Sequence, residues 1–226
     1  MIQEWEQVAC ALYDELGSPE APLSALELAR DCGFDVLGGL RGRSRLVGDR
    51  IIQIDETVHP AAQHAQVARE LARWGLLRFG LRSGEEASAH VAAALLLPRV
   101  VFQPELEQTL DPEVHSCRHP YVALELLARR MASLGDLLVS VWREGRLVER
   151  FAPAYLEPGR PARTEREIAA RARLSARPVV AGELRAYAVH EGAGGIDVVS
   201  LAPARVLVDL SDARHYARFP EVVARR

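Results

Sequence analysis

The stretch Val67-Ala-Arg-Glu-Leu-Ala-Arg-Trp-Gly-Leu-Leu77 decides the fold that the sequence predicts. Residues four apart lie on one face of a helix, so Arg69 and Arg73 share a face and Glu70 lies beside them. By itself, Arg-Glu-x-x-Arg is also the pattern of an ordinary solvated helix face. The flanking sequence must therefore decide between a surface helix and a functional one.

The same spacing occurs in the His-Glu-x-x-His helix of zinc peptidases, where two imidazoles bind the metal and the Glu takes a proton from the metal-bound water. In this chain Glu70 keeps the position of the base, whereas Arg69 and Arg73 occupy both ligand positions. A guanidinium group stays protonated and has no lone pair for a metal. The stretch therefore predicts a metallopeptidase helix that has lost its zinc.

The sequence around this helix resembles the ImmA/IrrE family of zinc metallo-endopeptidases from about residue 20 to residue 135. Residues 22–36 are similar to the opening helix and first strand of the family, and residues 46–55 to the strand pair before the metal helix. Trp74 stands where the family often has Trp after its second His. Residues 120–135 are similar to the later helix that ends in Arg-Leu-x-x-Leu-Gly.

Residues 85–98 resemble the segment that supplies the third zinc ligand in this family. The resemblance makes Glu85 the counterpart of that ligand, with Glu86 as the candidate in an alternative frame. Ser88, Ala89 and Val91 depart from the family pattern of Ala, Asn and Phe. The resemblance implies a zincin-like domain and, as partners, helix-turn-helix repressors that such proteins cleave or capture.

Two interpretations of the arginines remain open at this point. Guanidinium groups at 69 and 73 could replace the zinc charge by bridging Glu70 and Glu85, since arginine binds carboxylates in a bidentate manner. Alternatively, both side chains could extend to solvent without a partner. We expect the bridge.

Length and composition indicate an ordinary globular protein. The chain has 226 residues, 49% hydrophobic residues and a net charge of -3, which suit one substantial domain or two small ones. No apolar run approaches the ~18 residues that span a bilayer. The acidic N-terminus is not typical of a signal peptide, and the three cysteines are scattered. We expect a cytoplasmic protein without a membrane partner.

Periodicity and turn residues predict an α+β fold with three regions. Residues 1–100 form a metallopeptidase-like domain with a three-stranded sheet, residues 101–157 a helix and β-hairpin extension resembling a winged helix, and residues 158–226 a small α/β region. The hairpin turns at Glu144-Gly145, and a last strand is expected at 206–210.

Histidines outside the motif are further candidates for metal ligands. His64 and His90 lie off the faces that carry Arg69 and Glu85. The spacing of His115, Cys117 and His119 is compatible with a metal, but no fourth ligand is evident, and we favour a polar loop before Pro120. The turn at 191–195 lacks the Lys and Ser/Thr of a phosphate-binding loop.

We therefore predict a catalytically degenerate ImmA/IrrE-type protein with a regulatory or protein-binding role, no cofactor, and Glu70 as a vestigial base. One alternative is an active zinc endopeptidase that cleaves a repressor with unusual ligands. Another is a DNA-binding regulator acting through residues 100–177, because residues 118–177 contain 12 Arg against 7 acidic residues.

Overall fold

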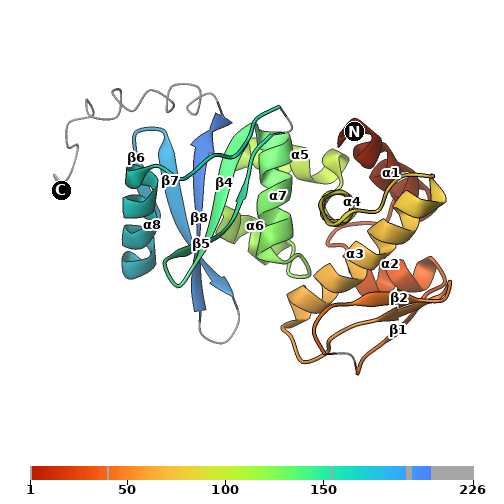
Figure 1. Ribbon diagram of the computed structural model, residues 1–226. Coiled ribbons are helices and arrows are strands. Elements are labelled where there is room, and N and C mark those ends of the chain that lie inside the picture. Colours follow the sequence, from red (N-terminus) through yellow and green to blue (C-terminus); the bar gives the residue numbers. More distant parts are fainter. Residues whose placement is uncertain (1, 40, 154, 192–194, 205–226) are drawn as a thin grey trace. The chain divides into compact units, whose positions relative to one another are not determined.

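The computed structural model describes residues 2–39, 41–153, 155–191 and 195–204 (Figure 1). The chain forms two compact units, Met1–Arg130 and Met131–Arg226, and each contains its own β-sheet. The predicted α+β class is confirmed. In the described residues no helix is long and apolar enough to span a membrane.

The N-terminal unit consists mainly of helices around a small sheet. The sheet has the order β1-β3-β2, with β1 parallel and β2 antiparallel to β3. The elements in chain order are α1 (Ile2–Glu15), α2 (Ala25–Asp31), β1 (Asp35–Leu37), β2 (Arg45–Val47), β3 (Ile51–Gln53), α3 (Pro60–Arg78), α4 (Glu85–Leu96), α5 (Arg99–Gln108), α6 (Pro112–Arg118) and the first part of α7 (Leu124–Gly135).

Helices α3 and α4 form the centre of this unit. Pro60 begins α3 at a position where its missing N–H costs nothing, and the side chain of His59 accepts a hydrogen bond from Ala61 N. Gly75 permits close packing against α1, because a Cβ there would lie 2.6 Å from Leu12 Cδ1. Almost every residue of α4 after its first turn is buried. Because α4 packs against α3, this contact fixes which face of α3 is turned toward the interior.

The C-terminal unit is an antiparallel sheet with one helix packed on a face. The elements are the end of α7, β4 (Leu137–Arg143), β5 (Arg146–Phe151), α8 (Arg163–Ser175), β6 (Val179–Ala181), β7 (Leu184–Glu191) and β8 (Gly195–Pro203). The strand order is β5-β4-β8-β7-β6. Helix α8 and the facing strands together form a core of buried residues, namely Leu138, Trp142, Ile168, Ala169, Ala172, Leu184, Ala186, Val198 and Ala202.

This arrangement differs from the three predicted regions. Strand β4 pairs with β5 on one side and with β8 on the other, so the hairpin is an integral part of a five-stranded sheet. The winged-helix-like unit at 101–157 is therefore not confirmed, because strands after residue 158 complete the sheet that begins at Leu137. Helices α5 and α6 occupy a segment for which the sequence analysis predicted no helix. The expected strand at 206–210 lies outside the described residues.

Candidate functional site

The carboxylate of Glu70 is closed off inside the N-terminal unit. Its residue is only 1% exposed, and its Oε1 accepts a hydrogen bond from the Ser44 hydroxyl at 2.7 Å. The same oxygen accepts a second hydrogen bond from Arg73 Nη1 at 2.8 Å, one helical turn further along α3. Glu70 is thus held by its own helix and by the loop before β2.

That loop is anchored to the rest of the unit through Asp55. Gly42 N donates to Asp55 Oδ2 at 2.7 Å, and both the backbone N and the hydroxyl of Thr57 donate to Oδ1. The hydrogen bond from Gly42, followed by those from Thr57, lowers the pKa of Asp55. Asp55 N in turn donates to Gln66 Oε1 of α3 at 2.8 Å. These contacts place Ser44 over Glu70.

The expected bridge between the arginines and both carboxylates forms only in part. Arg73 pairs with Glu70, but neither Arg69 nor Arg73 forms an ion pair with Glu85 in the part of the chain that the structure describes. Glu85 is the first residue of α4 and is exposed, and its Oε2 lies 3.8 Å from Arg43 Nη1. The expectation of a Glu85 bridge is therefore wrong, because the carboxylate faces solvent at the helix start.

Arg69 lies differently from its neighbour on the same face. Its Nε atom is buried and has no hydrogen-bond partner among the described residues. The alternative candidate Glu86 is exposed and pairs with Arg129 Nη1 at 2.5 Å. Neither glutamate of this segment therefore meets the α3 guanidinium groups.

The residues at the positions that the sequence resemblance assigns to zinc do not fit the metal. Two of the three positions carry guanidinium groups, and the third, Glu85, forms a solvent-exposed pair with Arg43. A zinc site in a peptidase needs three donor side chains directed at one point. Across the described residues no group of three His, Cys, Asp or Glu side chains is placed to hold a metal.

His64 and His90 have structural partners. His64 Nδ1 accepts a hydrogen bond from Ala25 N at 3.2 Å, and its ring stacks on Tyr121 at 4.7 Å. Burial lowers the pKa of His64. His90 Nε2 lies 2.9 Å from Glu6 Oε1, and its ring lies 5.6 Å from that of Trp5.

The segment with His115, Cys117 and His119 forms helix α6 and its C-cap rather than a loop. His119 Nε2 lies 2.9 Å from Glu105 Oε2, and His115 Nε2 lies 2.9 Å from Thr109 O. Both histidines are buried and lie within 3.6 Å of Glu105 Oε2, whereas Cys117 is exposed, so the helix separates Cys117 from the two histidines. Burial lowers the pKa of His115, which favours the neutral ring.

Sequence reasoning missed a buried polar cluster that joins α1, α4 and α7. Arg130 is 1% exposed; its Nη1 donates to Glu6 Oε1 and its Nε donates to Leu97 O at 2.8 Å. Burial raises the pKa of Glu6, but the hydrogen bonds from His90 and Arg130 outweigh it and lower the pKa to about 2. No local pattern marks these residues, since Glu6 and Arg130 are 124 positions apart.

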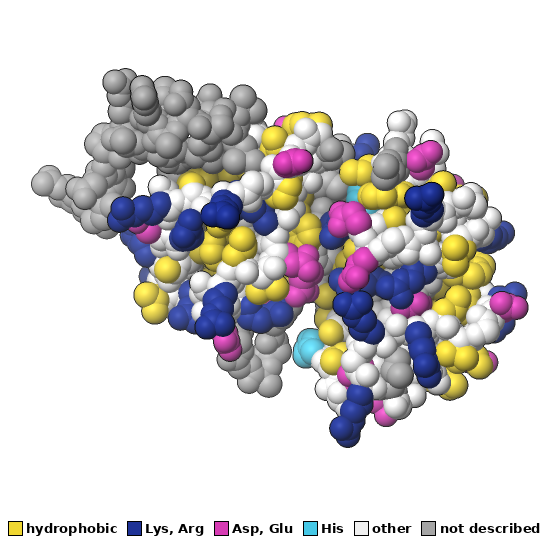
Figure 2. All heavy atoms as spheres, viewed as in Figure 1, with side chains coloured by type: hydrophobic (Ala, Val, Ile, Leu, Met, Phe, Trp, Pro, Cys, Tyr) yellow, Lys and Arg dark blue, Asp and Glu magenta, His cyan; other side chains and the backbone are white. Residues whose placement is uncertain are grey.

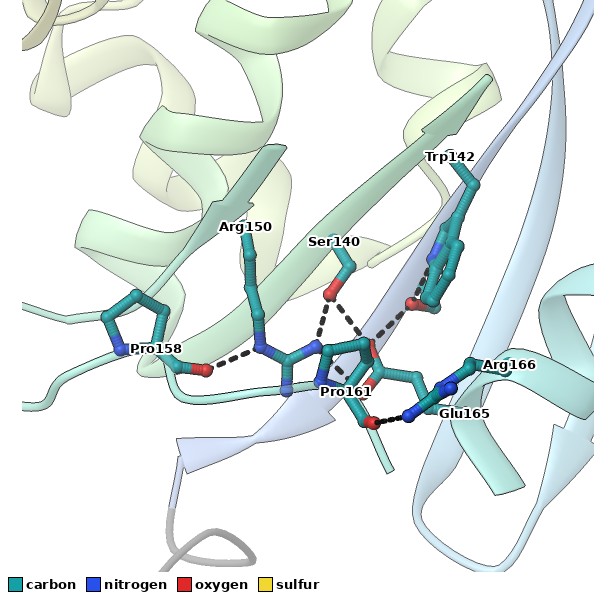
Figure 3. Close-up of polar contacts among 8 residues, drawn as sticks. Ser140, Trp142, Arg150, Pro158, Pro161, Glu165 and Arg166 are labelled. Carbon is teal, nitrogen blue, oxygen red and sulfur yellow. Dashed lines mark hydrogen bonds and ion pairs between the residues drawn. The ribbon is translucent and has the colours of Figure 1, made fainter. Parts of the chain in front are cut away.

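A second missed cluster lies beneath α8 in the C-terminal unit (Figure 3). Glu165 accepts hydrogen bonds from the hydroxyls of Ser140 at 2.6 Å and Ser200 at 2.9 Å. Arg150 Nη1 donates to both oxygens of Glu165, and the two side chains are 5% and 4% exposed. Trp142 Nε1 joins the network by donating to Ser200 Oγ at 2.8 Å.

Comparison with protein-family models and with curated proteins finds no match. Among solved structures, the chain is similar to a Mycobacterium tuberculosis transcriptional regulator, with a TM-score of 0.63 and 18% sequence identity. The similarity covers 89% of this chain and 76% of that chain. At this level of identity, it shows a shared fold.

Proposed function

We propose that the protein is a catalytically inactive homologue of the ImmA/IrrE metallo-endopeptidases, with a regulatory role exerted by binding a protein partner. The observation that carries the proposal is the closure of Glu70 by Ser44 and Arg73. The sequence resemblance assigns Glu70 the position of the general base. A structural likeness to a transcriptional regulator supports the regulatory context.

Closure of Glu70 supports the loss of peptidase chemistry at this position. A general base must reach the proton that it removes, directly or through one water. Glu70 is buried, and its Oε1 already accepts hydrogen bonds from the Ser44 hydroxyl and the Arg73 guanidinium group. The alternative of an active zinc endopeptidase with unusual ligands gains no support from these contacts.

The surroundings of the closed site favour binding of an acidic segment. The Arg43 side chain is 91% exposed, Arg41 is exposed beside it, and the Arg73 side chain is 35% exposed. On the face drawn in Figure 2, basic side chains gather over the region of α3 and the neighbouring sheet. Such groups pair with carboxylates by charge-assisted hydrogen bonds. We infer that the partner is a protein with an acidic surface segment, of which a helix-turn-helix repressor is the first candidate.

The proposal is tested with purified protein and a helix-turn-helix repressor from the same genome. Titration followed by fluorescence anisotropy should show saturable binding, and electrophoresis should show an intact repressor with zinc present. The double variant Arg41→Glu/Arg43→Glu should bind at least tenfold more weakly, whereas Arg30→Glu, an exposed arginine on α2, should bind normally. Repressor cleavage that a chelator abolishes would contradict the proposal. Tight binding to duplex DNA, with unchanged affinity in Arg41→Glu/Arg43→Glu, would instead support the DNA-binding alternative.

A further inference from the structure

The C-terminal unit contains a small cavity between α8 and the sheet, separate from the residues discussed above for peptidase chemistry. Its volume is about 70 Å³. The turn between β4 and β5 closes one side at Gly145. The remaining walls come from β4, α8 and β8, with an apolar part formed by Trp142, Ala169, Ala170 and Val198 and a basic part formed by Arg166 and Arg173.

The two arginines of this cavity carry charge that the structure does not neutralise. Three carboxylates next to lining residues already have their own partners: Glu165 pairs with Arg150, Glu167 with Arg163, and Asp197 with Arg143. Among the described residues, the side chain of Arg166 donates only to the backbone oxygen of Pro161, at 3.3 Å (Figure 3).

Arg173 forms no hydrogen bond or ion pair within the described ranges, and no acidic residue lines the cavity. Residues seven apart lie on one face of a helix, about two turns from each other. Arg166 and Arg173 therefore place two positive charges along one wall, and an anion there would meet both.

The opposite wall is held rigidly. The indole of Trp142 is fixed by its hydrogen bond to Ser200, and Ser200 is bound to the buried pair of Glu165 and Arg150. Preorganised walls reduce the ordering cost of binding a ligand. The small side chain of Ala170 keeps the cavity open, because a larger side chain at this exposed position would fill it.

From this geometry we propose that the cavity binds a small organic anion, a short monocarboxylate with an apolar tail. One water needs about 10–15 Å³ of such space, so the cavity holds roughly five to seven non-hydrogen atoms. The carboxylate pairs with Arg166 and Arg173, and the tail packs on Trp142 and Val198. The site is independent of the function proposed for the N-terminal unit.

Nuclear magnetic resonance of the full chain tests the proposal through the indole N–H signal of Trp142. The chain has 3 Trp, and Trp→Phe variants at Trp5 and Trp74 assign the signals. Titration with sodium butyrate at constant ionic strength should shift the Trp142 signal saturably. The neutral butyramide and the cation butylammonium should each bind at least tenfold more weakly.

Two variants remove different parts of the site, and both positions are exposed, so folding is retained. Arg173→Gln removes a charge and Ala170→Leu fills the cavity, and each should weaken butyrate binding at least tenfold. Arg171→Gln, an exposed position on α8 outside the cavity lining, should leave it unchanged. A Trp142 signal that does not respond would overturn the proposal. Equal losses of butyrate affinity in Arg171→Gln and Arg173→Gln would also overturn it. Equal affinity for inorganic phosphate and butyrate would do the same.

Discussion

Replacing Glu6 by Gln should remove a defined, acid-sensitive part of the stability of the N-terminal unit. Contacts with His90 and Arg130 lower the pKa of Glu6 from 4.5 to about 2. A pKa shift of one unit corresponds to about 1.4 kcal/mol, so the ionised Glu6 contributes at most about 3.5 kcal/mol at neutral pH. Because its side chain is 19% exposed, solvent screening reduces this contribution, and we expect a loss of about 2 kcal/mol at pH 7.

The sign of the pH dependence follows from the lowered pKa. Between about pH 4.5 and pH 2 the unfolded chain binds a proton at residue 6 that the folded protein does not. The contribution of Glu6 to stability is therefore complete above pH 4.5 and is lost as the pH falls through 2. Glu6→Gln should therefore be less stable than the wild type at neutral pH and should approach it in acid.

Urea unfolding followed by tryptophan fluorescence measures this difference, because Trp5 lies beside His90 in the same cluster. The exposed residue Asp14 on the same helix provides the control variant Asp14→Asn, which should keep the wild-type pH dependence. Free energies of unfolding that fall in parallel for the wild type and Glu6→Gln between pH 4.5 and pH 2.5 would refute the reasoning.

Two further changes test the buried pair and the former metal positions. Arg150→Met leaves the Glu165 carboxylate buried without a cation, so the free energy of unfolding in urea should fall by about 3–5 kcal/mol. The double variant Arg150→Met/Glu165→Leu should recover part of this loss. Full retention of stability in Arg150→Met would contradict the prediction. Arg69→His/Arg73→His supplies two imidazoles while Glu85 stays directed at Arg43. Calorimetry should therefore detect only weak zinc binding, and a cleavage assay should detect no peptidase activity. Tight, stoichiometric zinc binding by that variant would show that Glu85 can turn toward α3.

Local patterns in the sequence predicted most of the elements. The motif and the resemblance placed the segments that became α3, α4 and α7, and the β4–β5 turn falls at Glu144-Gly145 as expected. In α2, Ser24 caps the helix by accepting from Glu27 N. Helices α5 and α6 were missed because Pro104 lies inside α5 and because polar residues in α6 resemble a loop. A helix or turn could thus be predicted wherever its own residues carry the pattern that defines it.

Contacts between distant segments could not be predicted in the same way. The pairing of Leu137 with Pro203, which makes the hairpin part of a larger sheet, has no signature in either segment. The resemblance placed Glu85 beside the α3 face, but the direction of a side chain at a helix start depends on packing that the sequence does not display. Ser44 above Glu70 was missed for the same reason, since a loop anchored by Asp55 carries it there.

The zinc content of the purified wild-type chain tests the central claim most directly. The protein is incubated with excess zinc, dialysed, and measured by atomic emission, with cleavage assays run on the same sample. Because Arg69 and Arg73 offer no donor atoms and Glu70 is closed by Ser44 and Arg73, the account predicts strongly substoichiometric zinc and no cleavage. One zinc ion per chain together with chelator-sensitive cleavage would contradict it.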